Sequence, residues 1–204
     1  MRIYLLRHGE SIDDVEDSYG GIADFPLTDA GRGTARELAA HLSKSGIQVI
    51  YTSPYKRAYE TATIVSKALG CELKIIDSLR ERNSYGVLSG VNKEKAKEIF
   101  AHILGQLKSK PGDYYSDELV PGAEALDSFA TRVKKGFDEV VKDAAGRNII
   151  SIVTHGNVTR AVYQHILGVG GKVNPGLLAI TVLNYEPARI ELDRARTHGV
   201  EIVQ

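Results

Sequence analysis

The chain has 204 residues, of which 43% are hydrophobic and 25% are charged, a composition that is ordinary for a globular protein. Its 26 basic residues balance its 26 acidic residues, so no net charge attracts the whole protein to nucleic acid or to a membrane surface. The single cysteine, Cys71, excludes an intrachain disulfide and a cysteine-based metal site. No apolar run is long enough for a membrane span, and the first apolar stretch is too short for a signal peptide. We therefore expect a cytoplasmic protein with neither a nucleic-acid nor a membrane partner.

The first half of the chain alternates short β-branched or aromatic runs, which predict strands, with segments of helical periodicity. Thr28 is a suitable N-cap for a helix that stops at Gly46. Ser53 and Pro54 predict the N-cap and first position of a second helix, which would end at Gly70. The predicted strands of this half lie at 2–6, 47–52 and 72–77.

The second half continues this alternation. Helices are predicted over about 93–106 and about 122–144, and a last helix should begin just after Gly156 and run to about Leu167. The polar stretch 105–122 is interpreted as a flap over the sheet edge. The predicted strands of this half lie at 148–153, at 177–185 and at 188–194, the last as an edge strand or the return arm of a hairpin.

Strands that alternate with helices are typical of an α/β protein. We predict a three-layer α/β/α sandwich around a mostly parallel, six-stranded sheet. The length suits one such domain, and the sequence shows no internal repeat, low-complexity tract or linker. We therefore predict a single domain over 1–204, with a flap or insertion at about 83–122.

Chemically active side chains follow four of the predicted strands. Arg7 and His8 follow the first strand, and Arg57 lies in the first turn of the helix after the second. Glu81 follows the third strand, and His155 follows the fourth directly. Ligands of an open α/β sheet bind beyond the carboxyl ends of its strands. We therefore expect these side chains to converge on one rim of the sheet.

This set of residue types suits the transfer of a phosphoryl group. Arginine guanidinium groups match phosphoryl oxygens bidentately and stay charged near neutral pH. A histidine can attack phosphorus when one ring nitrogen is held as a donor, and a carboxylic acid can protonate the leaving oxygen. Gly9 and Gly156 would let backbone N–H groups approach the ligand closely. A phosphohistidine intermediate removes the need for a metal, so we expect neither a metal nor another cofactor.

Four segments together resemble the histidine phosphatase superfamily, which includes the cofactor-dependent phosphoglycerate mutases. They are LLRHGES at 5–11, TSPYKRAYETA at 52–62, LRER at 79–82 and THGNVTR at 154–160, and they span most of the chain in the right order. The resemblance implies that His8 is the phosphorylated nucleophile. It places Arg7, Arg57, His155 and Gly156 in the phosphate pocket. It makes Glu81 the general acid that protonates the leaving group and then activates water.

The resemblance also implies contacts around this pocket. Asn157 would lie beside the phosphate, and Ser11 would lie on the entrance loop. The stretch YGVLSGVNK at 85–93 resembles a pattern of the mutases in particular, which makes Tyr85 and Lys93 candidate substrate contacts.

The entrance loop departs from the family pattern. Many members carry an asparagine that touches the phosphate where this chain has Asp14. The following loop often carries an arginine and a glutamine, where this chain offers Ser18 and Gly20. An acid at position 14 would repel a phosphate unless it is protonated or turned outward. The entrance contacts are therefore left open.

Several of these residues also have a purely structural interpretation. Lys93 and Lys95 fit a solvated helix face, and Tyr85 fits a loop anchor. Glu124 resembles a family segment, but an acid near a helix N-terminus also offsets the helix dipole. Arg160 is expected to pack on its own helix. The remaining histidines are assigned no role: His41, His102, His165 and His198.

We predict a metal-independent phosphomonoester hydrolase that acts through phosphorylated His8 on a small phosphorylated metabolite. The alternative is a cofactor-dependent phosphoglycerate mutase, which 85–93 favours, although the mutases' paired arginines and proline-rich insertion are not evident at 105–122. A phosphate-binding module without turnover is a third hypothesis, but neither the nucleophile nor a pocket arginine is missing. The sequence identifies neither the substrate nor the oligomeric state, and a homodimer is one of the open alternatives.

Overall fold

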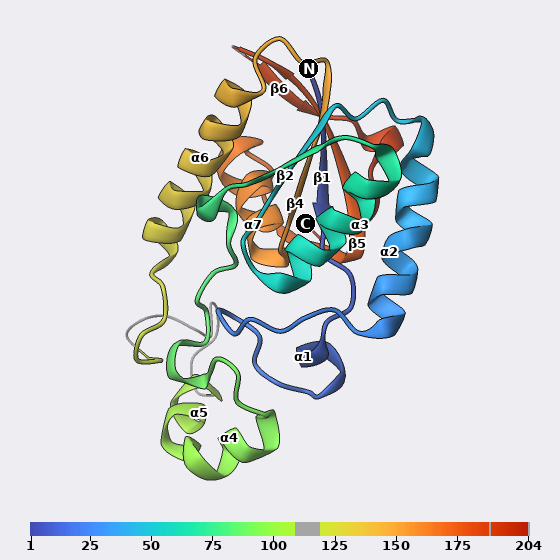
Figure 1. The fold of residues 1–204 in the computed structure, drawn as a ribbon. Coiled ribbons are helices and arrows are strands. Elements are labelled where there is room, and N and C mark those ends of the chain that lie inside the picture. Colours follow the sequence, from blue (N-terminus) through green and yellow to red (C-terminus); the bar gives the residue numbers. More distant parts are fainter. Residues whose placement is uncertain (109–118, 188, 204) are drawn as a thin grey trace.

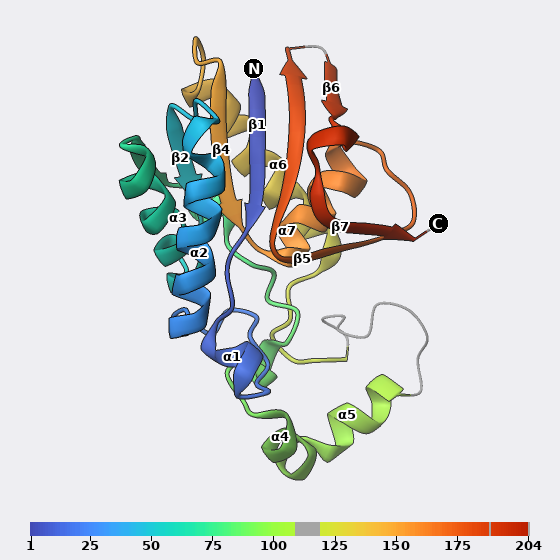
Figure 2. The ribbon, with the colours of Figure 1, turned by 90° about the vertical axis from the view of Figure 1, so that its right-hand side faces the viewer.

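The computed structural model describes residues 1–108, 119–187 and 189–203. Its centre is a seven-stranded sheet with helices on both faces (Figures 1 and 2). The strand order is β3-β2-β4-β1-β5-β6, and β7 also pairs with β5. The strands are β1 (Arg2–Arg7), β2 (Val49–Thr52), β3 (Glu72–Ile75), β4 (Ile149–Thr154), β5 (Lys172–Glu186), β6 (Arg189–Leu192) and β7 (His198–Val203).

This architecture confirms the predicted α/β/α sandwich. Strands β1 to β4 pair in parallel, and β5, β6 and β7 add antiparallel pairings on the far side of β1. The predicted return arm of a hairpin is β6, which pairs with the end of β5. Strand β7 was not predicted. It pairs with the first residues of β5. This part of β5 was not predicted as a strand either, because it contains Pro175 and Gly176, which disfavour strands.

Helices α2 and α3 cover one face of the sheet, and α6 and α7 cover the other (Figure 2). Leu38, Ala58 and Val65 belong to the apolar cluster on the first face, and Phe129 and Phe137 to the cluster on the second. Among the described residues, no helix is both long and apolar enough to span a membrane. The α-helices are α1 (Ile12–Val15), α2 (Asp29–His41), α3 (Lys56–Leu69), α4 (Lys93–Ile99), α5 (Ala101–Lys108), α6 (Leu126–Asp143) and α7 (Gly156–Ala161), and shorter helical turns lie at Leu42–Lys44, Asp77–Leu79, Gly86–Leu88, Val162–Ile166 and Arg194–Arg196.

The ends of the first two long helices follow local hydrogen bonding. Thr28 caps α2 as predicted, because its side chain accepts from a backbone N–H of the first turn at 2.8 Å. The predicted cap of α3 is wrong: the helix begins at Lys56, and Tyr55 rather than Ser53 is its N-cap. The Ser53 hydroxyl contacts His155 instead, at 2.7 Å.

Two later predictions also need correction. The helix expected over 93–106 is two helices, α4 and α5, which meet at Phe100. Asn92 caps α4 by accepting from two backbone N–H groups at 3.0 and 3.3 Å. The helix expected over 122–144 begins only at Leu126.

Helices α1, α4 and α5 lie beyond the carboxyl ends of the parallel strands (Figures 1 and 2). A small apolar cluster of its own, built on Tyr19, Leu88, Ala96 and Val120, packs this part together. Backbone hydrogen bonds also join the segment around α1 to the segment before α4. These two segments form one wall above the strand ends. Of the flap predicted at 105–122, residues 109–118 lie outside the described residues.

The pairing of β1 with β4 places the ends of the two strands at one level. Arg7 is paired with Thr154, the last residue of β4. The backbone N–H of His8 then donates to the Thr154 carbonyl at 2.9 Å. His8 and His155 are therefore neighbours at the carboxyl end of the sheet.

Two glycines with open space around them should respond in opposite ways to alanine. A Cβ at Gly33, inside α2, or at Gly70, at the end of α3, would meet no atom within 4 Å. Gly33→Ala should raise the free energy of unfolding by about 0.5–1 kcal/mol, because alanine favours a helix interior. Gly70 has a φ of 65°, so Gly70→Ala should lower the free energy of unfolding by about 1 kcal/mol. Urea unfolding followed by circular dichroism measures both, and changes of the same sign would contradict these backbone conformations.

Candidate active site

A cavity of about 330 Å³ opens beyond the carboxyl ends of β1 and β4. A second cavity, of about 390 Å³, lies at the opposite end of these strands beside Met1 and Arg2, and no histidine lines it. Ser11 and His155 are fully buried and do not line the first cavity. The other predicted site residues do line it: Arg7, His8, Asp14, Arg57, Glu81, Tyr85, Lys93, Gly156 and Asn157.

His8 is held in one tautomer by the backbone. Its Nδ1 lies 2.7 Å from the carbonyl oxygen of Gly9. A carbonyl only accepts hydrogen bonds, so Nδ1 carries the ring proton and Nε2 has a free lone pair. Burial, together with Arg57 and Arg7, holds the pKa of His8 well below its usual value. The side chain is therefore a neutral imidazole with a free lone pair at neutral pH.

The two arginines, buried Arg57 and half-buried Arg7, are cations that backbone carbonyls satisfy in part. Arg57 is 2% exposed and donates to the carbonyls of Ala23 and Gly21 at 2.8 and 2.9 Å. Arg7 donates through Nη1 to the Pro175 carbonyl at 2.8 Å, and its Nε is buried without a partner among the described residues. Burial lowers the pKa of Arg7, although a guanidinium stays charged at neutral pH. Each group keeps N–H donors for an anion.

His155 stands directly after β4 and has no exposed surface. Its ring centroid lies 5.2 Å from that of His8, in an edge-to-face arrangement. Nε2 is 2.7 Å from the Ser53 hydroxyl, whereas Nδ1 is buried without a partner among the described residues. Burial lowers the pKa of His155 well below its usual value, and Arg57 lowers it further.

The Glu81 carboxylate is fixed by two backbone N–H groups. Arg82 donates to Oε1 at 2.8 Å, and Asn157 donates to Oε2 at 3.3 Å. The Asn157 donor belongs to the first turn of α7, so Glu81 is tied to the element that follows His155. Arg7, His8, Arg57 and Glu81 therefore bring two cations, a neutral imidazole and a carboxyl group to one cavity, and the buried ring of His155 lies next to His8.

Comparison with known families agrees with this geometry. A family model described as histidine phosphatase superfamily (branch 1) matches residues 3–197. The chain belongs to this superfamily. The predicted resemblance is thereby confirmed over nearly the whole chain.

Similar superfamily members carry two kinds of name. Phosphoserine phosphatase 1 of Hydrogenobacter thermophilus is 32% identical to the chain over 169 residues, which cover 83% of the chain and 77% of that protein. A 2,3-bisphosphoglycerate-dependent phosphoglycerate mutase of Cytophaga hutchinsonii is 32% identical over 168 residues, which cover 80% of the chain and 76% of that protein. The crystal structure of a phosphoglycerate mutase from Bacillus anthracis shares the fold, with a TM-score of 0.81 over 95% of this chain and 91% of that one, at 24% identity.

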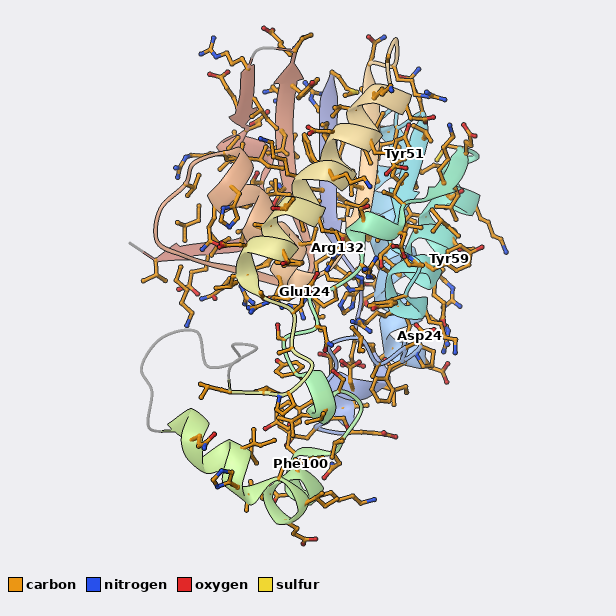
Figure 3. All side chains as sticks on the ribbon, turned by 90° about the vertical axis from the view of Figure 1, so that its left-hand side faces the viewer. Asp24, Tyr51, Tyr59, Phe100, Glu124 and Arg132 are labelled. Carbon is orange, nitrogen blue, oxygen red and sulfur yellow. The ribbon has the colours of Figure 1, made fainter. Side chains whose placement is uncertain are left out.

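A half-buried ion pair supports the loop that carries Glu81. Arg132 of α6 donates to both carboxylate oxygens of Glu124, at 2.9 and 2.7 Å, and Figure 3 shows the two side chains beside each other. The same guanidinium donates to the carbonyls of Ser78, Arg80 and Glu81 at 3.1, 2.9 and 3.4 Å. Glu124 therefore does more than offset a helix dipole, since it anchors Arg132 against this loop.

Two acids line the entrance side of the cavity, and a buried serine holds both. The Ser11 hydroxyl donates to Asp13 at 2.6 Å and also contacts Asp14 at 3.0 Å. The Ser11 backbone N–H donates to Asp14 at 2.8 Å. A Cβ at Gly20 would lie 2.2 Å from an Asp13 carboxylate oxygen, so glycine leaves room for this acid. Ser18 also lines the cavity.

The outer wall carries the two residues suggested by the mutase-like segment. Tyr85 packs against the Tyr19 ring at 5.0 Å, and burial raises its pKa. Lys93 forms an ion pair with Asp17. Both side chains line the cavity, so the structure brings them to the mouth of the site. Their part in substrate binding stays a prediction.

Sequence reasoning missed Arg160 as a cavity residue. It donates to the Asn157 side chain, one turn earlier on α7, at 2.9 Å, and to the Val173 carbonyl at 2.8 Å. It packs on its own helix as expected, and it also lines the cavity. Its spacing of three residues from Asn157 was the available signal. Throughout 1–108, 119–187 and 189–203, no group of three or more His, Cys, Asp or Glu side chains could hold a metal ion.

The buried neutral histidines should make stability fall in mild acid. The unfolded chain binds a proton at each histidine below about pH 6.5, whereas the folded protein does not, because burial lowers the pKa of His8 and of His155. The free energy of unfolding should therefore drop by up to about 1.4 kcal/mol per pH unit for each of them as the pH falls below about 6.5. Urea unfolding between pH 5 and 7 should show a smaller slope for His155→Gln than for the wild type. The exposed His198→Gln should keep the wild-type slope, and equal slopes for all three proteins would contradict the assignment.

Proposed function

We propose that this protein hydrolyses a small phosphomonoester through a phosphohistidine on His8 and needs no metal. The observation that carries the proposal is a neutral histidine whose Nε2 is free, in a cavity lined by the guanidinium groups of Arg7 and Arg57. The relatives named phosphoserine phosphatases support hydrolysis. Phosphoserine is therefore a suitable first substrate to assay.

The reaction takes two steps in which atoms and charges balance. In the first, the Nε2 lone pair of His8 forms a bond to phosphorus while the bond from phosphorus to the leaving oxygen breaks. The Glu81 carboxyl group acts as the general acid and gives a proton to that oxygen, which leaves as an alcohol. In the second, a water molecule attacks phosphorus, the nitrogen–phosphorus bond breaks, and the lone pair returns to Nε2. Glu81, now a carboxylate, takes the proton of the water, and inorganic phosphate leaves.

The arginines supply the positive charge that a metal provides in other phosphatases. Phosphoryl transfer spreads negative charge over the equatorial oxygens of phosphorus, and fixed donors stabilise that charge in the transition state. Arg57 is anchored to two carbonyls and Arg7 to one, so their positions are set before substrate binds. This preorganisation is the physical basis for activity without a metal.

The entrance charges favour hydrolysis over mutase activity. A mutase must bind a second anionic substrate, or a bisphosphate, beside the phosphohistidine. Here Asp13 and Asp14 line the cavity, and Lys93 is already paired with Asp17. Among the described residues, Arg160 is the remaining cation of the outer cavity, and it shares the cavity with these two acids, so little positive charge is left there for a bisphosphate. The relatives named phosphoglycerate mutases support the alternative, which is mutase activity. Assays of the interconversion of phosphoglycerates, with and without 2,3-bisphosphoglycerate, separate the two activities.

The nucleophile can be tested by trapping. On rapid acid-free denaturation during turnover of a labelled monoester, the wild type should carry phosphate that is stable in base and labile in acid. His8→Ala should carry none and should lose at least about 10⁴-fold in kcat, because the covalent path is removed. Turnover of the wild type should persist in EDTA. His198→Ala, which alters an exposed histidine of β7, should trap and turn over like the wild type. Equal trapping by His8→Ala would overturn the proposal.

The role of Glu81 can be tested by the leaving group. An alkyl phosphate has an alkoxide as its leaving group, which is poor and needs a proton. The leaving group of 4-nitrophenyl phosphate is nitrophenolate, which is a stable anion. Glu81→Gln should lower kcat for the alkyl ester by about 10²–10⁴-fold and should affect the nitrophenyl ester much less. Glu139→Gln, on the exposed side of α6, serves as the control and should affect neither ester. An equal loss for both esters would contradict general-acid catalysis by Glu81.

A further inference from the structure

The Ser53 hydroxyl is a buried group that the proposed function has not used. It lies at the end of β2, has no exposed surface, and contacts Nε2 of His155 at 2.7 Å. No other ring nitrogen contact of His155 exists in the described part of the chain, since Nδ1 is buried without a partner. Only Nδ1 is therefore left to meet a ligand.

The direction of this hydrogen bond follows from the other contact of the hydroxyl. The backbone N–H of Tyr55 donates to Ser53 Oγ at 3.3 Å, so the oxygen already accepts one bond. If His155 also donated from Nε2, the hydroxyl proton would lack an acceptor, because none other than Nε2 contacts it in the described residues. If Ser53 donates to Nε2, its proton is used and Nδ1 of His155 carries the ring proton. The second arrangement satisfies every group but Nδ1–H.

The two histidines of the site then share one tautomer for opposite reasons. An acceptor, the Gly9 carbonyl, holds the proton of His8 on Nδ1. A donor, the Ser53 hydroxyl, keeps the lone pair of His155 on Nε2 and so leaves its proton on Nδ1. His8 consequently offers the ligand a lone pair, and His155 offers it an N–H group. The ring of His155 does not line the cavity itself, but its centroid lies only 5.2 Å from that of His8. A phosphoryl group bonded to His8 would therefore come within reach of His155.

We propose that Ser53 is a positioning residue that fixes His155 as the neutral Nδ1–H tautomer, so that His155 donates a hydrogen bond to the transferred phosphoryl group. The inference rests on the proposed function, because it takes the ligand of the cavity to be a phosphoryl group. In the other tautomer, a lone pair would face the negative oxygens and repel them. The Ser53 hydroxyl thereby makes the contact between His155 and the phosphoryl oxygens attractive rather than repulsive. His155 keeps its proton through both steps of the reaction.

The tautomer can be read directly by nuclear magnetic resonance. In protein labelled with ¹⁵N-histidine, a protonated ring nitrogen and an unprotonated one resonate at clearly different shifts. The signals of His155 are identified as those that His155→Gln lacks. We expect a protonated Nδ1 and an unprotonated Nε2 in the wild type at neutral pH. Saturating inorganic phosphate should shift the Nδ1–H proton downfield, as a new hydrogen bond requires.

Variants then test the part of Ser53. Ser53→Ala should give His155 a mixed or reversed tautomer and lower kcat by about 10-fold, less than the 10²–10³-fold that loss of a complete transition-state donor costs. KM should change less than kcat. Ser53→Thr retains the hydroxyl and should restore the wild-type tautomer. Thr52→Val removes a buried hydroxyl one residue away that contacts only backbone carbonyls, and it should leave the tautomer unchanged.

Two results would overturn the proposal. One is an unprotonated Nδ1 on His155 in the wild type, which needs no variant to fold. The other is Ser53→Ala with the wild-type tautomer and the wild-type kcat. Circular dichroism and thermal unfolding establish that each variant is folded before it is compared. The tautomer measurement requires no turnover, so its failure is distinguishable from a failure of the proposed function, which would appear as absent hydrolysis with an intact Nδ1–H.

Discussion

The parallel ladder between β1 and β4 is the constraint on which the site depends. Its backbone pairs run from Arg2 with Ile149 to Arg7 with Thr154, so the two strands end level. The next residue of each segment is a histidine, and the two rings become neighbours although they are far apart in sequence. A slip of one residue would turn each side chain to the other face of the sheet. The geometry of the phosphoryl site is therefore a property of backbone pairing as much as of the side chains.

Burial gives these side chains their chemical states. Burial disfavours the charged form of an imidazole, and the neighbouring guanidinium groups disfavour its protonation further. The guanidinium groups themselves need acceptors, which backbone carbonyls supply in part. Arg57 takes two of these from the entrance segment, at Gly21 and Ala23, so the cation that would bind phosphate also holds the entrance in place. The remaining N–H donors of the two guanidinium groups are left for an anion. The cavity is therefore suited to a negatively charged ligand.

The sequence predicted that the inner residues lie close together, because each follows a strand whose pattern is clear. His8, Arg57 and His155 needed only the rule that parallel strands end at one rim. The prediction from sequence failed where a side chain contacts a residue far away in the chain. Ser53 was predicted to cap a helix, yet its hydroxyl contacts His155, which follows another strand. Arg160 was expected to pack on its own helix, and only the structure shows that it also lines the cavity. Local patterns carry no information about such long-range hydrogen bonds.

The choice between hydrolysis and transfer lies in the outer cavity. Relatives with phosphatase names and relatives with mutase names are about equally similar to this chain, so the inner residues alone do not separate them. Both reactions begin with the same attack by a histidine, and they differ in what accepts the phosphoryl group. An anionic acceptor must be held by positive charge, but here Asp13 and Asp14 line the cavity and Asp17 neutralises Lys93, which leaves Arg160 as the outer cation among the described residues. Water needs no such charge, and so this entrance favours water as the acceptor.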